Sequence, residues 1–109
     1  MIISNVKIGN EIKSIVIENG KIAEITEKHF SSGIDAKCQR VIPGLIDVHT
    51  HGCIGIDTMD ADFKPMCEFY AKHGTTSFLP TTMTMPYEDL LKVTKAKTDF
   101  DGANILGFH

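Results

Sequence analysis

The sequence predicts an α/β protein in which a small antiparallel β-sheet precedes a β-α-β-α-β arrangement. Runs rich in isoleucine and valine, with partial alternation, occupy residues 2–8 and 12–18, as is typical of strands. From residue 63 onward the apolar residues recur with a helical period. Short β-type runs at 76–80 and 104–109 follow the helical stretches. Strands separated by helices favour parallel pairing, so the second part of the chain is expected to contain a parallel sheet.

The amino-terminal sheet is predicted from a hairpin signal. The dipeptide Asn19-Gly20 lies between two β-type runs in IVIENGKIAEI, and Asn-Gly favours the left-handed dihedral angles of a two-residue turn. The small polar residues SSG mark residues 26–37 as a loop. We therefore expect residues 1–40 to form a small β-segment and residues 41–109 to form a separate domain.

The second part begins with the apolar strand VIPGLIDVH at 41–49, which Pro43-Gly44 interrupts early. A loop at 52–62 follows, and Asp62 can cap the helix after it. Three parallel strands with two helices leave open sheet edges, so the sequence is typical of the opening of a larger sheet. The expected buried face of the first helix comprises Phe63, Met66, Cys67 and Tyr70. On a second helix that Pro86 opens it comprises Tyr87, Leu90 and Leu91, and Val93 extends it along one edge.

Composition excludes several classes of function. The chain has 109 residues, 42% of them hydrophobic and 23% charged, with a formal net charge of −3. It therefore lacks the basic character of a nucleic-acid partner or of a membrane-surface protein. No apolar stretch approaches the roughly 20 residues that span a bilayer, and no signal peptide opens the chain, so a cytoplasmic location is expected. The three cysteines (Cys38, Cys53 and Cys67) have no CxxC spacing and are expected to be reduced.

Two histidines end the predicted strand at 41–49. Side chains alternate along an extended strand, so Asp47, His49 and His51 share one face. The two histidines lie about 6–7 Å apart along the chain, from a rise of about 3.3 Å per residue. Two imidazoles at this spacing can converge on one cation, and Asp47 can support them from behind or serve as a buried structural acid.

Other polar residues allow more than one interpretation. Asp57 and Asp60 more often cap or solvate a loop than act as a catalytic base. His73 precedes a helix-ending glycine and is more typical of a helix carboxyl terminus than of a metal ligand. Thr81 and Thr82 end the strand at 76–80, where they can contact a ligand or simply favour the strand, and both interpretations stay open.

Longer motifs carry a family resemblance. PGLIDVHTHG resembles the first-strand signature of the amidohydrolase superfamily, metal-dependent hydrolases built on a (β/α)8 barrel. The stretches HGCIGIDTMD, AKHGTTSFLPTTMT and ANILGFH resemble the N-acetylglucosamine-6-phosphate deacetylase family in order and spacing. HGTTSFLPTT is not generic to the superfamily, and the resemblance covers nearly the whole chain.

The resemblance implies a fold, a reaction and a site. Residues 41–109 would be the first three strands and two helices of an incomplete (β/α)8 barrel, and residues 1–40 part of the small β-sandwich that flanks it. His49 and His51 would bind a divalent metal ion (Zn, Fe, Mn or Co). His109 matches the last histidine before a Leu-Glu-Gly-Pro segment that supplies a glutamate ligand, and it is a candidate contact together with Thr81 and Thr82.

The resemblance also implies partners. The full enzyme would hydrolyse the N-acetyl amide of an amino-sugar phosphate to glucosamine 6-phosphate and acetate, as a homo-oligomer without nucleic-acid or membrane partners. The later ligands and the catalytic aspartate are not among these 109 residues, so no catalytic residue is assigned and the isolated chain is expected to be inactive. A complete barrel typically needs about 250 residues.

Two alternatives remain at this stage. Another amidohydrolase, such as a dihydroorotase-like enzyme or a deaminase, would fit the first-strand signature, although HGTTSFLPTT argues against it. Alternatively, the chain is a non-catalytic module that self-associates through its open sheet edges, because unpaired strand edges are templates for pairing.

Overall fold

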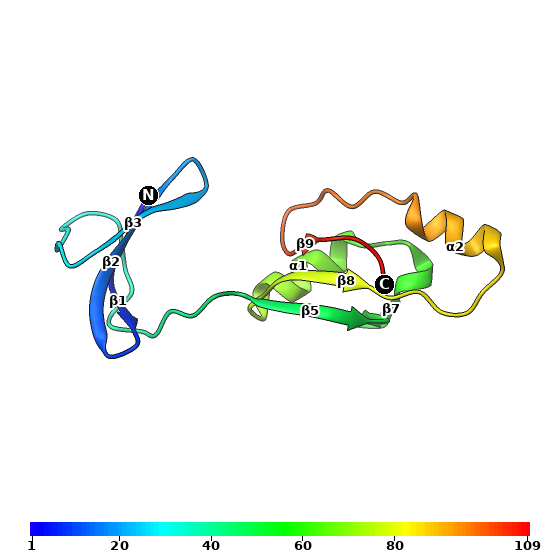
Figure 1. Cartoon of the computed structure of the whole chain (residues 1–109), viewed down its shortest axis with the longest axis horizontal. Coiled ribbons are helices and arrows are strands. Elements are labelled where there is room, and N and C mark those ends of the chain that lie inside the picture. Colours follow the sequence, from blue (N-terminus) through cyan, green and yellow to red (C-terminus); the bar gives the residue numbers. More distant parts are fainter. The chain divides into compact units, whose positions relative to one another are not determined.

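The protein is a mixed α/β chain with two compact units. The computed structural model describes all 109 residues (Figure 1). Unit 1 comprises Met1–Pro43 and unit 2 comprises Gly44–His109. No helix in either unit is long and apolar enough to cross a membrane.

Unit 1 is a four-stranded sheet with the strand order β3-β2-β1-β4. The central strands are antiparallel, and the predicted hairpin is confirmed, since Asn19 and Gly20 adopt positive φ angles of 52° and 73° between β2 and β3. Its strands are β1 (Ile2–Ile8), β2 (Glu11–Glu18), β3 (Lys21–Thr26) and β4 (Ile34–Asp35).

The predicted loop at 26–37 is wrong in part, because β4 lies within it and pairs with β1 in parallel. A side-chain contact supports this pairing: Asn5 Nδ2 donates to Asp35 Oδ1 at 2.8 Å. The same hydrogen bond is the largest cause of the lowered pKa of Asp35. Asn5 has a φ of 53° at an irregularity of β1, a conformation that asparagine tolerates better than most residues. Such a contact between side chains distant in sequence is not visible in local periodicity.

The apolar side of unit 1 is only partly covered. Val6 and Ile15 are buried, whereas Ile22 and Ile42 remain 62% and 64% exposed. An apolar hollow of about 290 Å³ lies within the unit. It is lined by Ile8, Ile15, Ile22, Ile25, Val41, Ile42 and Pro43.

Unit 2 contains the predicted β-α-β-α-β order. Its main sheet has three parallel strands in the order β5-β8-β9, and a short antiparallel hairpin, β6-β7, follows β5. The elements are β5 (Leu45–Thr50), β6 (Gly52–Cys53), β7 (Ile56–Asp57), a 3₁₀ helix η1 (Thr58–Asp60), α1 (Lys64–Lys72), β8 (Thr75–Pro80), α2 (Tyr87–Thr94) and β9 (Asn104–Ile105).

Several predicted boundaries differ from the structure. The strand expected at 41–49 begins only at Leu45, because Pro43 offers no amide proton to a strand partner. The strand expected at 104–109 is limited to Asn104–Ile105. Asp62 does not cap α1: the capping position is Phe63, which makes no side-chain cap hydrogen bond.

One apolar core holds unit 2 together. The first predicted helix face is confirmed, with Tyr70 packed at its margin. On α2 the expected face is confirmed in part: Val93 is buried and Leu90 and Leu91 are half-buried, but Tyr87 is 71% exposed. The buried members of the core are Phe63, Met66, Cys67, Phe78, Val93 and Ala103.

Phe78→Ala should destabilise unit 2 strongly, since Phe78 is fully buried at the centre of the sheet. Truncation of a buried phenylalanine costs about 3–5 kcal/mol, a large share of the stability of a small domain. Urea unfolding followed by circular dichroism measures the change. Leu106→Ala is the control, because Leu106 is 60% exposed. Equal effects of the two substitutions would contradict this account of the core.

Candidate metal site

The two histidines converge at the carboxyl end of β5. His49 Nε2 and His51 Nε2 are 3.2 Å apart. The two rings meet edge to face, with centroids 5.0 Å apart and an interplanar angle of 83°. Both side chains are exposed to solvent. The strand therefore presents two imidazole nitrogens to the same point.

An irregularity of β5 accompanies this arrangement. The pairing of β5 with β8 matches Asp47 with Phe78 and then Thr50 with Pro80. Three residues of β5 therefore pair with two residues of β8, as in a β-bulge. Bulges commonly lie next to functional sites, where they change the direction of a side chain. Here the extra residue lies in the segment that carries His49.

A neighbouring strand end fixes the orientation of His51. His51 Nδ1 lies 3.1 Å from the carbonyl oxygen of Thr81. Because a carbonyl oxygen only accepts, the proton of a neutral His51 ring is on Nδ1. Nε2 then has a free lone pair on the side of His49. Metal-binding histidines generally make this kind of hydrogen bond through the nitrogen that does not bind the metal.

The spacing of the two nitrogens fits one metal ion. Two nitrogen ligands about 2.0–2.1 Å from a tetrahedral zinc ion lie about 3.3–3.4 Å from each other. The 3.2 Å between the two Nε2 atoms is close to this value. However, no set of three or more His, Cys, Asp or Glu side chains is arranged to hold a metal ion. The pair thus has the geometry of half a coordination shell.

The other predicted site residues lie around this pair. Asp47 Oδ1 accepts a hydrogen bond of 3.1 Å from the backbone N–H of His49. The ring centroid of His109 lies 4.7 Å from that of His49. His109 is attached to the end of β8, because its carbonyl accepts from the Thr82 amide at 2.9 Å and its amide donates to Pro80 at 3.0 Å. The structure therefore gathers all the predicted site residues at one end of the sheet.

Sequence reasoning missed the polar network behind the histidines. Thr50, between the two histidines, is buried, and its Oγ1 lies 2.6 Å from the hydroxyl of Tyr70 on α1. Thr58 Oγ1 donates to the carbonyl of Thr50 at 3.3 Å. Burial raises the pKa of Tyr70, so its hydroxyl stays protonated at neutral pH. A threonine between two histidines at a strand end was the only sequence signal for this network.

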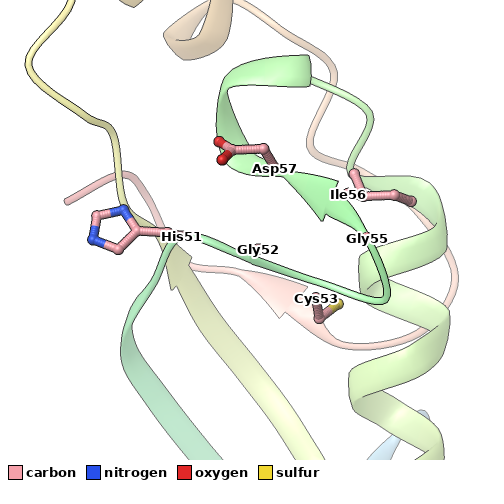
Figure 2. Close-up of a pocket in the computed structure, with 6 residues that line it drawn as sticks. All are labelled: His51, Gly52, Cys53, Gly55, Ile56 and Asp57. Atoms are coloured by element: carbon pink, nitrogen blue, oxygen red, sulfur yellow. The ribbon is translucent and has the colours of Figure 1, made fainter.

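An open hollow of about 440 Å³ adjoins His51. Figure 2 shows the His51 ring and the Asp57 carboxylate on one side of the β6-β7 hairpin, with Cys53 and Ile56 toward α1. Asp57 caps η1, as expected for a loop acid, since its Oδ1 accepts from the Met59 amide at 2.8 Å. Burial raises the pKa of the Cys53 thiol, which favours its protonated form at neutral pH.

His73 also occupies its expected place away from the site. It caps the carboxyl end of α1, where Nδ1 lies 2.8 Å from the carbonyl oxygen of Phe69. This contact matches the prediction of a histidine at a helix carboxyl terminus.

The chain is similar to known deacetylases. It is 32% identical to an N-acetylglucosamine-6-phosphate deacetylase from Lysinibacillus sphaericus, over 100% of this chain and 32% of the relative. It is 34% identical to the enzyme of that name from Bacillus subtilis, over 85% of this chain and 28% of the relative. The chain thus spans about a third or less of the length of these curated relatives. No protein-family model matches it.

Solved structures agree with the sequence comparison. The crystal structure of N-acetylglucosamine-6-phosphate deacetylase from Thermotoga maritima matches with a TM-score of 0.71 and 34% identity, over 87% of this chain and 26% of that one.

A shorter stretch, 55% of this chain, is 40% identical to a 5'-deoxyadenosine deaminase from Methanosarcina mazei. The deacetylases therefore account for more of the chain than the deaminase does.

Gly52→Ala should disturb the hairpin beside the candidate site. Gly52 has a φ of 142°, and a Cβ there would collide with the carbonyl oxygen of Ile56. We expect a loss of about 1–3 kcal/mol in stability, the usual range for a strained backbone position. Urea unfolding measures it, with Gly55→Ala as the control. Gly55 also has a positive φ, but nothing lies within 4 Å of its added Cβ. A loss no larger than that of the control would contradict the close approach.

Proposed function

We propose that this chain, which belongs to the N-acetylglucosamine-6-phosphate deacetylase family, supplies two histidine ligands to the divalent metal ion of an amide hydrolase. The reaction is hydrolysis of the N-acetyl group of N-acetylglucosamine 6-phosphate to glucosamine 6-phosphate and acetate. The similarity to deacetylases of that name supports this substrate, and the site residues support the metal.

One observation carries the proposal more than any other. The Nε2 atoms of His49 and His51 lie 3.2 Å apart while the Thr81 carbonyl occupies Nδ1 of His51. A simple hydrogen bond between two exposed imidazoles does not need a second hydrogen bond that orients the His51 ring. A metal site benefits from that second bond, because a ligand whose ring is already oriented loses less freedom on binding.

The residues of this chain bind and orient in this proposal. His49 and His51 hold the metal, which supplies polarisation of the amide carbonyl and acidification of a water molecule. Asp47 holds the amide of His49, and Thr81 holds the ring of His51. His109 and Thr82 line the same end of the sheet and are proposed contacts for substrate or for the following loop.

The rest of the site is proposed to lie in parts of the longer relatives that this chain does not match. A catalytic zinc site typically has three protein ligands and a water molecule, and two histidines do not complete it. The parallel strands β5, β8 and β9 are proposed to be the first three of a (β/α)8 barrel, in which sites lie at the carboxyl ends of the strands. Unit 1 is proposed to be part of a flanking β-sandwich. A cytoplasmic location and a homo-oligomeric state stay predictions.

Metal binding tests the proposed pair directly. After dialysis against zinc and removal of excess metal, elemental analysis of the purified chain should show zinc that the double variant His49→Ala/His51→Ala lacks. The matched control is His73→Ala, because the ring of His73 contacts Phe69 of its own helix, away from the pair. Zinc that is equal in the wild type and the double variant would contradict the assignment of the pair.

The reaction requires a second experiment. The isolated 109-residue chain should release no acetate from N-acetylglucosamine 6-phosphate, since it offers only part of a site. A chimera in which this chain replaces the matching segment of the Lysinibacillus sphaericus enzyme should release acetate. His49→Ala/His51→Ala in that chimera should lower kcat/KM by at least about a hundredfold. A folded chimera with full activity despite both substitutions would refute the proposed role.

A further inference from the structure

We infer that Thr81 is a positioning residue that locks the two-histidine strand end in its metal-binding geometry. The inference deepens the proposed function, on which its metal-binding consequence rests. It assigns Thr81 a role toward β5 rather than toward substrate. The role depends on three contacts made by one residue on two neighbouring residues of the adjacent strand end.

The three contacts use every polar group of Thr81. Its amide donates to the Thr50 carbonyl at 2.7 Å. Its hydroxyl oxygen accepts from the Thr50 amide at 3.1 Å. Its carbonyl accepts from His51 Nδ1 at 3.1 Å. Thr81 therefore fixes the two peptide units that flank Thr50, between the two histidines, and also fixes the second ring.

The hydroxyl adds an acceptor for the Thr50 amide at an irregular point of the ladder. The register shifts between Asp47 and Thr50, next to the pairing of Thr50 with Pro80. The Thr81 side chain accepts from the Thr50 amide at this point. Thr50 is 8% exposed and Thr81 is 3% exposed, so water cannot easily take its place. One intramolecular hydrogen bond contributes about 0.5–1.5 kcal/mol net.

The same contacts argue against a substrate role for the Thr81 side chain. Its hydroxyl already accepts from Thr50 and donates to the Leu79 carbonyl at 3.3 Å. A hydroxyl that is buried, donates its only proton and already accepts one hydrogen bond is poorly placed to bind a ligand. Thr82 differs, because it is less buried and its hydroxyl donates to His109 at the rim.

Three variants separate the hydroxyl from the shape of the side chain. Thr81→Val keeps the shape and removes the acceptor, whereas Thr81→Ser keeps the hydroxyl. Thr76→Val is the matched control, because Thr76 lies on the same strand and its hydroxyl donates to β5 at Leu45, at the other end of the pair. All three are made in the 109-residue chain.

Nuclear magnetic resonance of the metal-free protein provides the first readout. In the wild type and in Thr81→Ser, long-range ¹⁵N spectra should show the proton of neutral His51 on Nδ1, and the Thr50 amide should be protected from exchange. In Thr81→Val, Thr50 should exchange at least about tenfold faster, and His51 should populate both tautomers. In Thr76→Val, the exchange rate of Thr50 and the tautomer of His51 should stay unchanged. In Thr81→Val, the exchange rate of the Phe78 amide should stay unchanged. These controls exclude general loosening of the sheet.

Two results would overturn the inference. The first is a wild-type His51 with its proton on Nε2, which needs no variant and holds even if Thr81→Val fails to fold. The second is a Thr81→Val protein with unchanged Thr50 exchange and His51 tautomer.

Titration with Co²⁺, followed by its visible absorption, distinguishes this inference from the proposed function. We expect Thr81→Val to bind about 10–100-fold more weakly than Thr81→Ser. Equal affinities would overturn the inference and leave the metal function standing. No binding by the wild type, with the expected tautomer and exchange pattern, would overturn the metal function and support the positioning role.

Discussion

The contact between Thr50 and Thr81 is the constraint on which the candidate site depends. Both backbone groups of Thr50 are held by Thr81, and the two histidines are the residues on either side of Thr50. Their nitrogens meet because the peptide units between them cannot rotate independently. From the opposite side, Tyr70 of α1 contacts the Thr50 hydroxyl, which links the site to the helix layer.

The strand that supplies this contact is itself fixed by the core of unit 2. Phe78, two residues before Pro80, is fully buried, and Phe63, Met66 and Cys67 of the α1 region pack in the same cluster. Apolar packing therefore sets the position of β8, and β8 sets the position of the histidines. The site lies at the exposed end of the sheet, but its geometry derives from the buried middle.

Much of the fold could be predicted because its signals are local. The Asn19-Gly20 turn, the first helix face and the order of strands and helices follow from periods and turn residues within short windows. The errors arise where a distant partner decides. The pairing of β4 depends on β1, and Tyr87 is exposed although helical spacing places it on the face of Leu90 and Leu91.

The candidate site shows the same division. Alternation along a strand placed His49 and His51 on one face, and their convergence follows from it. Alternation could not reveal that Thr81 would satisfy the amide between them, because that contact crosses 31 positions of sequence. The short distance from His109 to His49 likewise depends on the pairing of β9 with β8. Residue types identify which groups can bind a metal, whereas strand register determines which of them meet.

Because Thr81 joins the histidines to β8, ligand binding and strand pairing are one thermodynamic equilibrium. Separation of β5 from β8 breaks the contacts of Thr50 and releases the His51 ring at the same time. Any cation that binds only the assembled pair must therefore disfavour that separation by mass action. The hydrogen-exchange rate of the Thr50 amide should therefore show whether the two imidazoles have bound a cation.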